Sequence, residues 1–162
     1  MQSLNEAIRA YTIQLQNGEI QKAYKGIMTF MSGLKTYLES QHPDYSVSGL
    51  YFGYMDMTYF AFTPLEFKQR SLKVAIVYLH EQNRFEVWLG GANRKVQANY
   101  IEIFRVKENL GFQLSEVSPG VDSIVEMRLI EHPDFDHPED LMLAIESKVV
   151  AFSGMINDLL HA

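Results

Sequence analysis

The chain has 162 residues, of which 47% are hydrophobic and 21% charged, so it fits one globular domain spanning residues 1–162 and is too apolar for intrinsic disorder. It contains no cysteine, which excludes thiol nucleophiles, zinc–thiolate sites and disulfides and favours a reducing, cytoplasmic location. The formal net charge of −6 makes nucleic acid an unfavourable partner. No apolar run approaches the roughly 20 residues that span a bilayer, so we expect no membrane partner.

Two helices are predicted at the N-terminus. Ser3 and Glu6 have the spacing of a capping box, and Asn17 and Gly18 end the first helix. The apolar stripes are Leu4, Ile8, Tyr11 and Leu15 for the first helix, and Ile20, Tyr24, Ile27, Met31, Leu34 and Leu38 for the second. Because the link between them is short, we expect the two helices to form an antiparallel hairpin.

Aromatic and β-branched residues predict strands in the middle of the chain. We expect two strands within residues 47–62, a central, almost continuously apolar strand over residues 72–79, and an alternating strand over residues 85–89. The short link between the last two predicts an antiparallel β-hairpin. Residues 124–130 alternate and predict a further strand, and residues 112–117, in an otherwise polar loop, allow a short edge strand.

Two more helices complete the predicted pattern. Gly90 and Gly91 turn the chain into a helix, and the inner side of that helix is expected to carry Val96, Tyr100, Ile103 and Phe104. Pro138 opens a long last helix whose first turn holds acidic residues, where the helix dipole favours them. The order predicts an α+β fold with an N-terminal helical hairpin, a mostly antiparallel sheet of about five strands, one helix after the fourth strand and a long C-terminal helix.

Two candidate sites lie on the predicted strands. Asp56 is enclosed by an aromatic segment, where desolvation would raise its pKa and suit acid–base or metal chemistry; the alternative is an aspartate in a hairpin turn. Glu86 and Trp88 are two residues apart in one strand and therefore share a face of the sheet. A tryptophan beside a carboxylate suits a small-molecule pocket, and the alternative is an amphipathic face partly covered by a helix.

A third candidate site lies where the strand before Gly90 leads into a helix. Asn93 suits the N-cap, but Arg94 and Lys95 then fall in the first turn, where cations oppose the helix dipole by up to about 1 kcal/mol each. An anion held by backbone N–H groups, Asn93 and the two cations would resolve this conflict. The alternative is that both long side chains extend into solvent or pair with nearby acids.

The segment 131–140 has the composition of a metal-ligand cluster, because it contains two histidines and five acids. Its spacing matches no calcium-binding loop, since the glycine that makes the sharp turn of such loops is missing. An acid-rich entrance to the last helix accounts for the composition without a metal. We therefore expect no metal and no cofactor.

Three segments carry a resemblance, namely residues 53–60 (Gly-Tyr-Met-Asp-Met-Thr-Tyr-Phe), 73–77 (Lys-Val-Ala-Ile-Val) and 85–89 (Phe-Glu-Val-Trp-Leu). Together with Asn93, Arg94 and Gln97 they resemble an uncharacterised bacterial protein family, most closely over residues 45–104. The resemblance implies no activity, but it marks a region. The candidate ligand-binding residues in that region are Asp56, Glu86, Trp88, Asn93, Arg94 and Gln97.

The sequence assigns no single function. We expect a non-catalytic binding or regulatory domain for an anionic small molecule or a protein partner, and a homo-oligomer is compatible with this. The alternative is a metal-dependent nuclease-like enzyme or a degenerate relative, by loose similarity to the core of restriction-endonuclease-like enzymes. Asp56 and Glu86 would bind the cation. The lysine that such enzymes have two residues after the glutamate is Trp88 here, so Lys95 or Arg94 would have to replace it.

Overall fold

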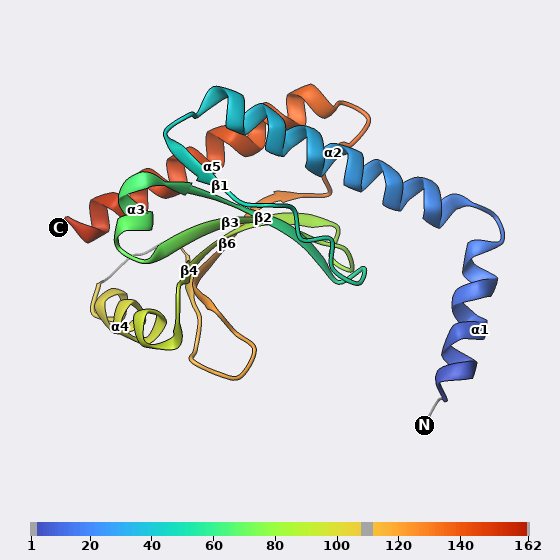
Figure 1. Ribbon diagram of the computed structural model, residues 1–162, viewed down its shortest axis with the longest axis horizontal. Coiled ribbons are helices and arrows are strands. Elements are labelled where there is room, and N and C mark those ends of the chain that lie inside the picture. The colour runs from blue at the N-terminus through green and yellow to red at the C-terminus, as the bar shows by residue number, and fades with distance from the viewer. Residues whose placement is uncertain (1–2, 108–111, 162) are drawn as a thin grey trace.

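Figure 1 shows the computed structural model of the protein, which describes residues 3–107 and 112–161. The elements in chain order are α1 (Leu4–Leu15), α2 (Glu19–Gln41), β1 (Tyr45–Val47), β2 (Met57–Pro64), α3 (Leu65–Gln69), β3 (Leu72–Leu79), β4 (Arg84–Gly91), α4 (Arg94–Arg105), β5 (Gln113–Leu114), β6 (Ser123–Glu131) and α5 (Pro138–Leu160). The predicted α+β fold is confirmed, with N-terminal helices, a helix after β4 and a long C-terminal helix. The short helix α3 was not predicted, and residues 108–111 of the predicted loop lie outside the described residues.

The strands form one antiparallel sheet in the order β1-β2-β3-β4-β6-β5. The predicted hairpin between β3 and β4 is confirmed, with Leu79 opposite Arg84 at its closed end. The sheet has six strands rather than about five. Within residues 47–62, where two strands were predicted, the one long strand is β2, and short strands over residues 45–47 and 113–114 form the two edges. β4 and β6 are direct neighbours although α4 and β5 separate them in the sequence.

One face of the sheet is covered by α2 and α5, which lie side by side across it (Figure 1). Successive residues of a strand point to opposite faces, so each strand turns every second side chain toward these helices. Phe60, Ile76 and Val87 are three such side chains, and all are fully buried. They belong to one continuous core with Leu34 of α2 and Ile145 of α5. On the opposite face of the sheet, α4 lies at one end (Figure 1).

Helix α1 is well capped but does not belong to the core. The capping box is confirmed, since Glu6 N–H donates to Ser3 Oγ at 3.1 Å and Ser3 N–H donates to Glu6 Oε2 at 2.8 Å. No residue of α1 is buried, and Figure 1 shows α1 projecting away from the sheet at a steep angle to α2. The two predicted helices are present, but they do not pack as an antiparallel pair. The chain turns at Gly18 (φ 78°), and the first buried residue of α2 is Phe30, roughly 18 Å further along its axis, so α1 lies beyond the core.

The predicted inner side of α4 is confirmed in part. Phe104 is buried, and Val96 and Tyr100 are half-buried and pack against the core, whereas Ile103, which the helical spacing placed on the inner side, is 38% exposed. Gln97 and Ile101 are buried in addition, because α4 packs on β4 and β6. As a result Gln97, a polar residue, is buried and must find hydrogen-bond partners.

Helix α5 buries an apolar stripe with helical spacing, which includes Leu141, Ile145, Val149, Phe152 and Ile156. Its first turn holds two acidic residues behind the proline at its start, as expected from the helix dipole. Among the helices of the described residues, none combines the length and the apolar character that crossing a membrane requires.

Candidate binding site on the open sheet face

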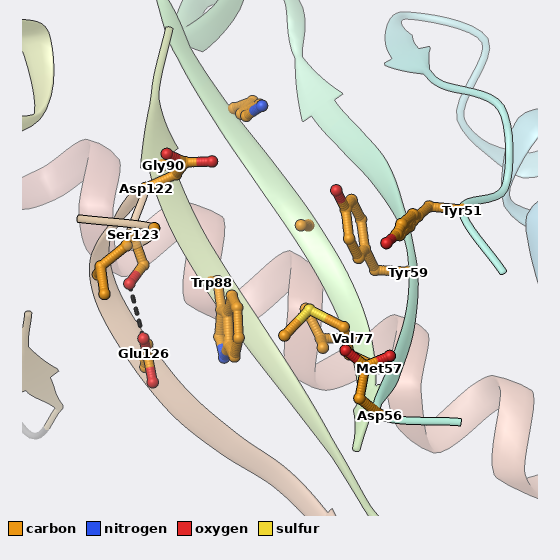
Figure 2. Close-up of a pocket in the computed structure, with 14 residues that line it drawn as sticks. Tyr51, Asp56, Met57, Tyr59, Val77, Trp88, Gly90, Asp122, Ser123 and Glu126 are labelled. Atoms are coloured by element: carbon orange, nitrogen blue, oxygen red, sulfur yellow. Dashed lines mark hydrogen bonds between the residues drawn. The ribbon is translucent and has the colours of Figure 1, made fainter. Parts of the chain in front are cut away.

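A pocket of about 360 Å³ lies on the sheet face opposite α2 and α5 (Figure 2). Its floor consists of cross-strand neighbours, because Ala75 of β3 lies opposite Trp88 of β4, and Lys73 lies opposite Gly90. Trp88 in turn lies opposite Glu126 of β6. Residues directly opposite one another on neighbouring strands share a face, so three strands contribute side chains to one surface.

The hollow in this surface comes from small residues beside large ones. Ala75 and Gly90 carry almost no side chain, whereas Trp88 and Tyr59 are large and stand beside them. Val77 is fully buried although it points away from α2 and α5, because its larger neighbours shield it from water. The floor of the pocket is therefore apolar and aromatic, with Trp88 at its centre (Figure 2).

One rim of the pocket is formed by the segment that enters β2. Tyr51 stacks on Tyr59 with ring centroids 4.9 Å apart, and the two residues exchange backbone hydrogen bonds of 2.8 and 3.0 Å. Asp56 holds the turn between them, because its Oδ1 accepts a hydrogen bond from the Tyr54 N–H at 2.9 Å. The turn requires Gly53, whose φ is 75° and where a Cβ would overlap a backbone carbonyl oxygen. The turn alternative for Asp56 is therefore the one that the structure shows.

The opposite rim is formed by the chain that leads into β6. Gln97, buried on α4, donates from Nε2 to the carbonyl oxygens of Val121 at 2.8 Å and Ser123 at 3.0 Å. The Ser123 hydroxyl donates to Glu126 Oε2 at 2.6 Å and so orients that carboxylate (Figure 2). Helix α4 thereby fixes the position of the loop that brings Asp122 to the pocket.

The charged lining residues are three carboxylates and one amine, namely Asp56, Asp122, Glu126 and Lys73. Hydrogen bonds from backbone N–H groups of its own turn lower the pKa of Asp56, so this carboxylate is charged at neutral pH. Burial raises the pKa of Tyr59, so the phenol stays neutral. The pocket therefore combines an uncharged aromatic floor with an acidic rim.

Comparison with known proteins adds a family to this description. Residues 4–160 match the family described as a domain of unknown function, DUF7000. The chain belongs to this family. The match runs from α1 to α5, so it includes the sheet and the pocket, and the resemblance to an uncharacterised family is confirmed. No curated protein and no solved structure shows significant similarity to the chain.

The pocket of this DUF7000 domain contains two of the residues predicted for a site. Asp56 lies on the rim and Trp88 on the floor. Glu86 shares the face of Trp88, as predicted, but it is buried beside the pocket, where its Oε2 accepts from Arg84 Nε at 2.6 Å and its Oε1 accepts from Trp88 Nε1 at 2.8 Å. Glu86 therefore orients the tryptophan ring. The nuclease alternative, in which Asp56 and Glu86 share a cation near Lys95, stays a prediction.

The residues predicted for the anion site lie at the start of α4, next to the loop before β6, and outside the pocket. Asn93 is the N-cap of α4, as predicted, and its Oδ1 accepts from a backbone N–H of the first turn at 2.9 Å. Arg94 Nη1 donates to the carbonyl oxygen of Ser118 at 3.1 Å, and Lys95 is exposed. Arg94 and Gln97 thus both tie the loop to α4. The anion at this junction stays a prediction.

The acid-rich segment before α5 is held by its own hydrogen bonds. Asp134 accepts from the backbone N–H of Asp136 at 3.1 Å and contacts His137 Nδ1 at 2.7 Å. Within residues 3–107 and 112–161, no group of three or more histidine, aspartate and glutamate side chains is placed to hold a metal ion. The segment forms the entrance to α5, as its composition suggested.

Sequence reasoning missed the two carboxylates of the β6 side, Asp122 and Glu126. The alternation along residues 124–130 placed Glu126 on a face of the sheet, which is a usable signal. Nothing in that pattern indicates that β6 pairs with β4, so the position of Glu126 beside Trp88 could not be predicted.

His80 lies at the end of β3, where its ring stacks on Tyr24 of α2 with centroids 6.0 Å apart. The Thr58 hydroxyl donates to the carbonyl oxygen of Phe52 at 2.7 Å, so its oxygen accepts a hydrogen bond from the N–H of His80 Nε2 at 2.8 Å. Burial lowers the pKa of His80, and the nearby charge of Asp56 opposes this. The folded protein thus favours the neutral ring.

We expect the stability to fall as the pH drops below about 6.5, the pKa of histidine in an unfolded chain. In that range the unfolded chain binds a proton that folded His80 resists, so unfolding becomes more favourable as the pH falls. His80→Gln removes the titration and keeps a side-chain N–H for Thr58. Urea unfolding between about pH 7 and pH 5.5 should therefore show a weaker pH dependence for the variant. Identical pH dependence in both proteins would show that His80 does not contribute.

Proposed function

We propose that this DUF7000 domain is a non-catalytic binding or regulatory domain that holds a small organic molecule in the pocket on the open sheet face. The observation that supports this most directly is the aromatic floor. An uncovered face of an antiparallel sheet usually carries polar side chains, because it faces water. Here Trp88 and Tyr59 line the hollow, and a ligand that covers them removes apolar surface from water.

The size and construction of the pocket also favour a small molecule. Its volume of about 360 Å³ falls in the range of roughly 300–1,000 Å³ that is usual for small-molecule sites. Hydrogen bonds of Asp56 hold one rim and those of Gln97 hold the other. A pocket whose rims are already ordered loses little conformational entropy when a ligand binds.

Trp88 is the single tryptophan of the chain, so its fluorescence reports directly on the pocket. The test is a screen of cationic, neutral and anionic fragments by ligand-observed NMR, with hits confirmed by Trp88 fluorescence. Ala75→Leu places a branched side chain on the floor, on the face away from the core. We expect it to weaken the binding of hits by at least about 100-fold while leaving the melting temperature nearly unchanged.

Two further variants locate the site. Ala151→Leu adds the same side chain at an exposed position of α5 and should leave binding unchanged. Lys95→Ala should also leave it unchanged, since Lys95 is exposed at the start of α4 and does not line the pocket. Fragments that bind Ala75→Leu as tightly as the natural chain would contradict the proposal. Loss of an anionic fragment in Lys95→Ala alone would instead indicate a site at the start of α4.

We also propose that the protein works in a reducing compartment such as the cytoplasm. The absence of cysteine from the chain supports this, because proteins of oxidising compartments commonly use disulfides. Fractionation of cells that express a tagged chain tests it, and recovery of the protein outside the cytoplasmic fraction would contradict it.

A further inference from the structure

Three carboxylates surround the aromatic floor. Figure 2 shows Asp56 and Glu126 on opposite sides of Trp88, and Asp122 beside Gly90. In the part of the chain that the structure describes, none of the three forms an ion pair with an arginine, lysine or histidine. Lys73 is the amine among the lining residues, so three negative charges face one positive charge.

Two other carboxylates near the sheet have a side-chain partner of opposite sign or a histidine. Glu86, whose side chain is 6% exposed, contacts Arg84 at 2.6 Å, and Glu146 contacts His42 at 2.7 Å. Glu126 is half-buried at the edge of the aromatic hollow, whereas Asp56 and Asp122 are exposed, and a half-buried charge gains most from a partner of opposite sign. An external cation would supply that partner. Its attraction would exceed that on an open surface, because the apolar floor lowers the local dielectric constant.

The floor between the carboxylates suits a cation attached to an apolar group. Trp88 forms its centre, and the stacked rings of Tyr51 and Tyr59 form one side. The faces of aromatic rings attract ammonium groups, and tryptophan does so most strongly. An anion would meet the negative faces of these rings and an excess of carboxylates.

We propose that the ligand of this pocket is an organic cation, a primary or quaternary ammonium joined to an apolar body. This rests on the proposed function, because it names the ligand chemistry of the same site. The apolar body occupies the space over Ala75 beside Tyr59, and the ammonium lies over Trp88 and Gly90, within reach of the rim carboxylates of Glu126 and Asp122. This ligand differs in charge and place from the anion that the sequence predicts at the start of α4.

Three probes with a common apolar body test the charge of the ligand: phenylpropylamine, phenylpropanol and phenylpropionate, which are cationic, neutral and anionic at neutral pH. Binding is measured by Trp88 fluorescence and ligand-observed NMR at low ionic strength, because salt screens accessible charges. We expect the amine to bind at least about tenfold more tightly than the alcohol, with the carboxylate weakest. Added salt should reduce this difference.

Asp122→Asn removes one rim charge at nearly constant shape. The hydrogen bond that Asp122 accepts in the described chain is made by its backbone carbonyl oxygen, from the Gly91 N–H, so the substitution leaves it in place. We expect the amine to bind roughly three- to tenfold more weakly and the alcohol to bind as before. The matched control is Asp44→Asn, at an exposed position outside the pocket, which should change neither affinity.

The outcomes separate this inference from the proposed function. Equal binding of the amine and the alcohol, or tightest binding of the carboxylate, overturns the cationic ligand; if Ala75→Leu still abolishes that binding, the pocket remains the site. Amine binding that survives Ala75→Leu overturns both the cationic ligand of this pocket and the proposed function, because the ligand then lies elsewhere. Failure of all three probes to bind up to their solubility limits overturns the cationic ligand.

Discussion

Glu86→Ala is expected to lower the free energy of unfolding by about 3 kcal/mol. Glu86 is 4% exposed, and Arg84 and Trp88 both donate to its carboxylate. The substitution leaves a half-buried guanidinium and an indole N–H without their acceptor, and removing one member of a buried pair costs about 3–5 kcal/mol. We expect the lower end of this range because Glu131 lies 3.8 Å from Arg84 and still offers the guanidinium a negative charge. Urea unfolding followed by circular dichroism measures the change.

Glu131→Ala is the matched control, because Glu131 contacts the same arginine from a position where its side chain is 44% exposed. We expect a change below about 1 kcal/mol. The comparison also bears on the nuclease alternative. A carboxylate kept for metal chemistry can be removed with little loss of stability or even a gain, so a neutral Glu86→Ala would favour that alternative.

Leu34→Ala is expected to lower the free energy of unfolding by about 3 kcal/mol. Leu34 lies on α2, is 0% exposed and belongs to the core between the sheet and the helix pair. Truncation removes apolar contacts and leaves a cavity that its neighbours fill only partly. Urea unfolding with an unchanged m-value would confirm that the effect is one of stability alone.

Leu4→Ala makes the same chemical change on α1, where Leu4 is 76% exposed. We expect the stability to change by no more than about 0.5 kcal/mol. If Leu4→Ala destabilises the protein as much as Leu34→Ala, α1 is buried in solution, and analytical ultracentrifugation would then show whether a second copy of the chain covers it.

The candidate site was partly predictable from its strands. Arg84, Glu86 and Trp88 are spaced two residues apart, and alternate residues of a strand share a face. This spacing brings Arg84 and Trp88 to either side of the Glu86 carboxylate, which accepts hydrogen bonds from both. Asp56 was likewise predictable as a turn residue, because its short side chain can accept from a nearby backbone N–H.

The acidic rim was not predictable. Asp122 and Glu126 reach the pocket because β6 pairs with β4 and because Gln97 of α4 holds the loop before β6. Both contacts join parts of the chain more than 20 residues apart. The alternation within β6 shows which residues share a face, but it contains no information about the strand that lies beside them.

The sequence by itself determined the four longer helices, the longer strands and the hairpin between β3 and β4, because capping, turns and apolar periodicity act between residues close together in the chain. The tertiary structure decided which stripes are buried. The stripes of α1 and α2 have the same helical spacing, yet Leu34 is buried and Leu4 is exposed. It also decided the strand order, and with it the pocket, because burial and strand pairing depend on partners that are distant in the sequence.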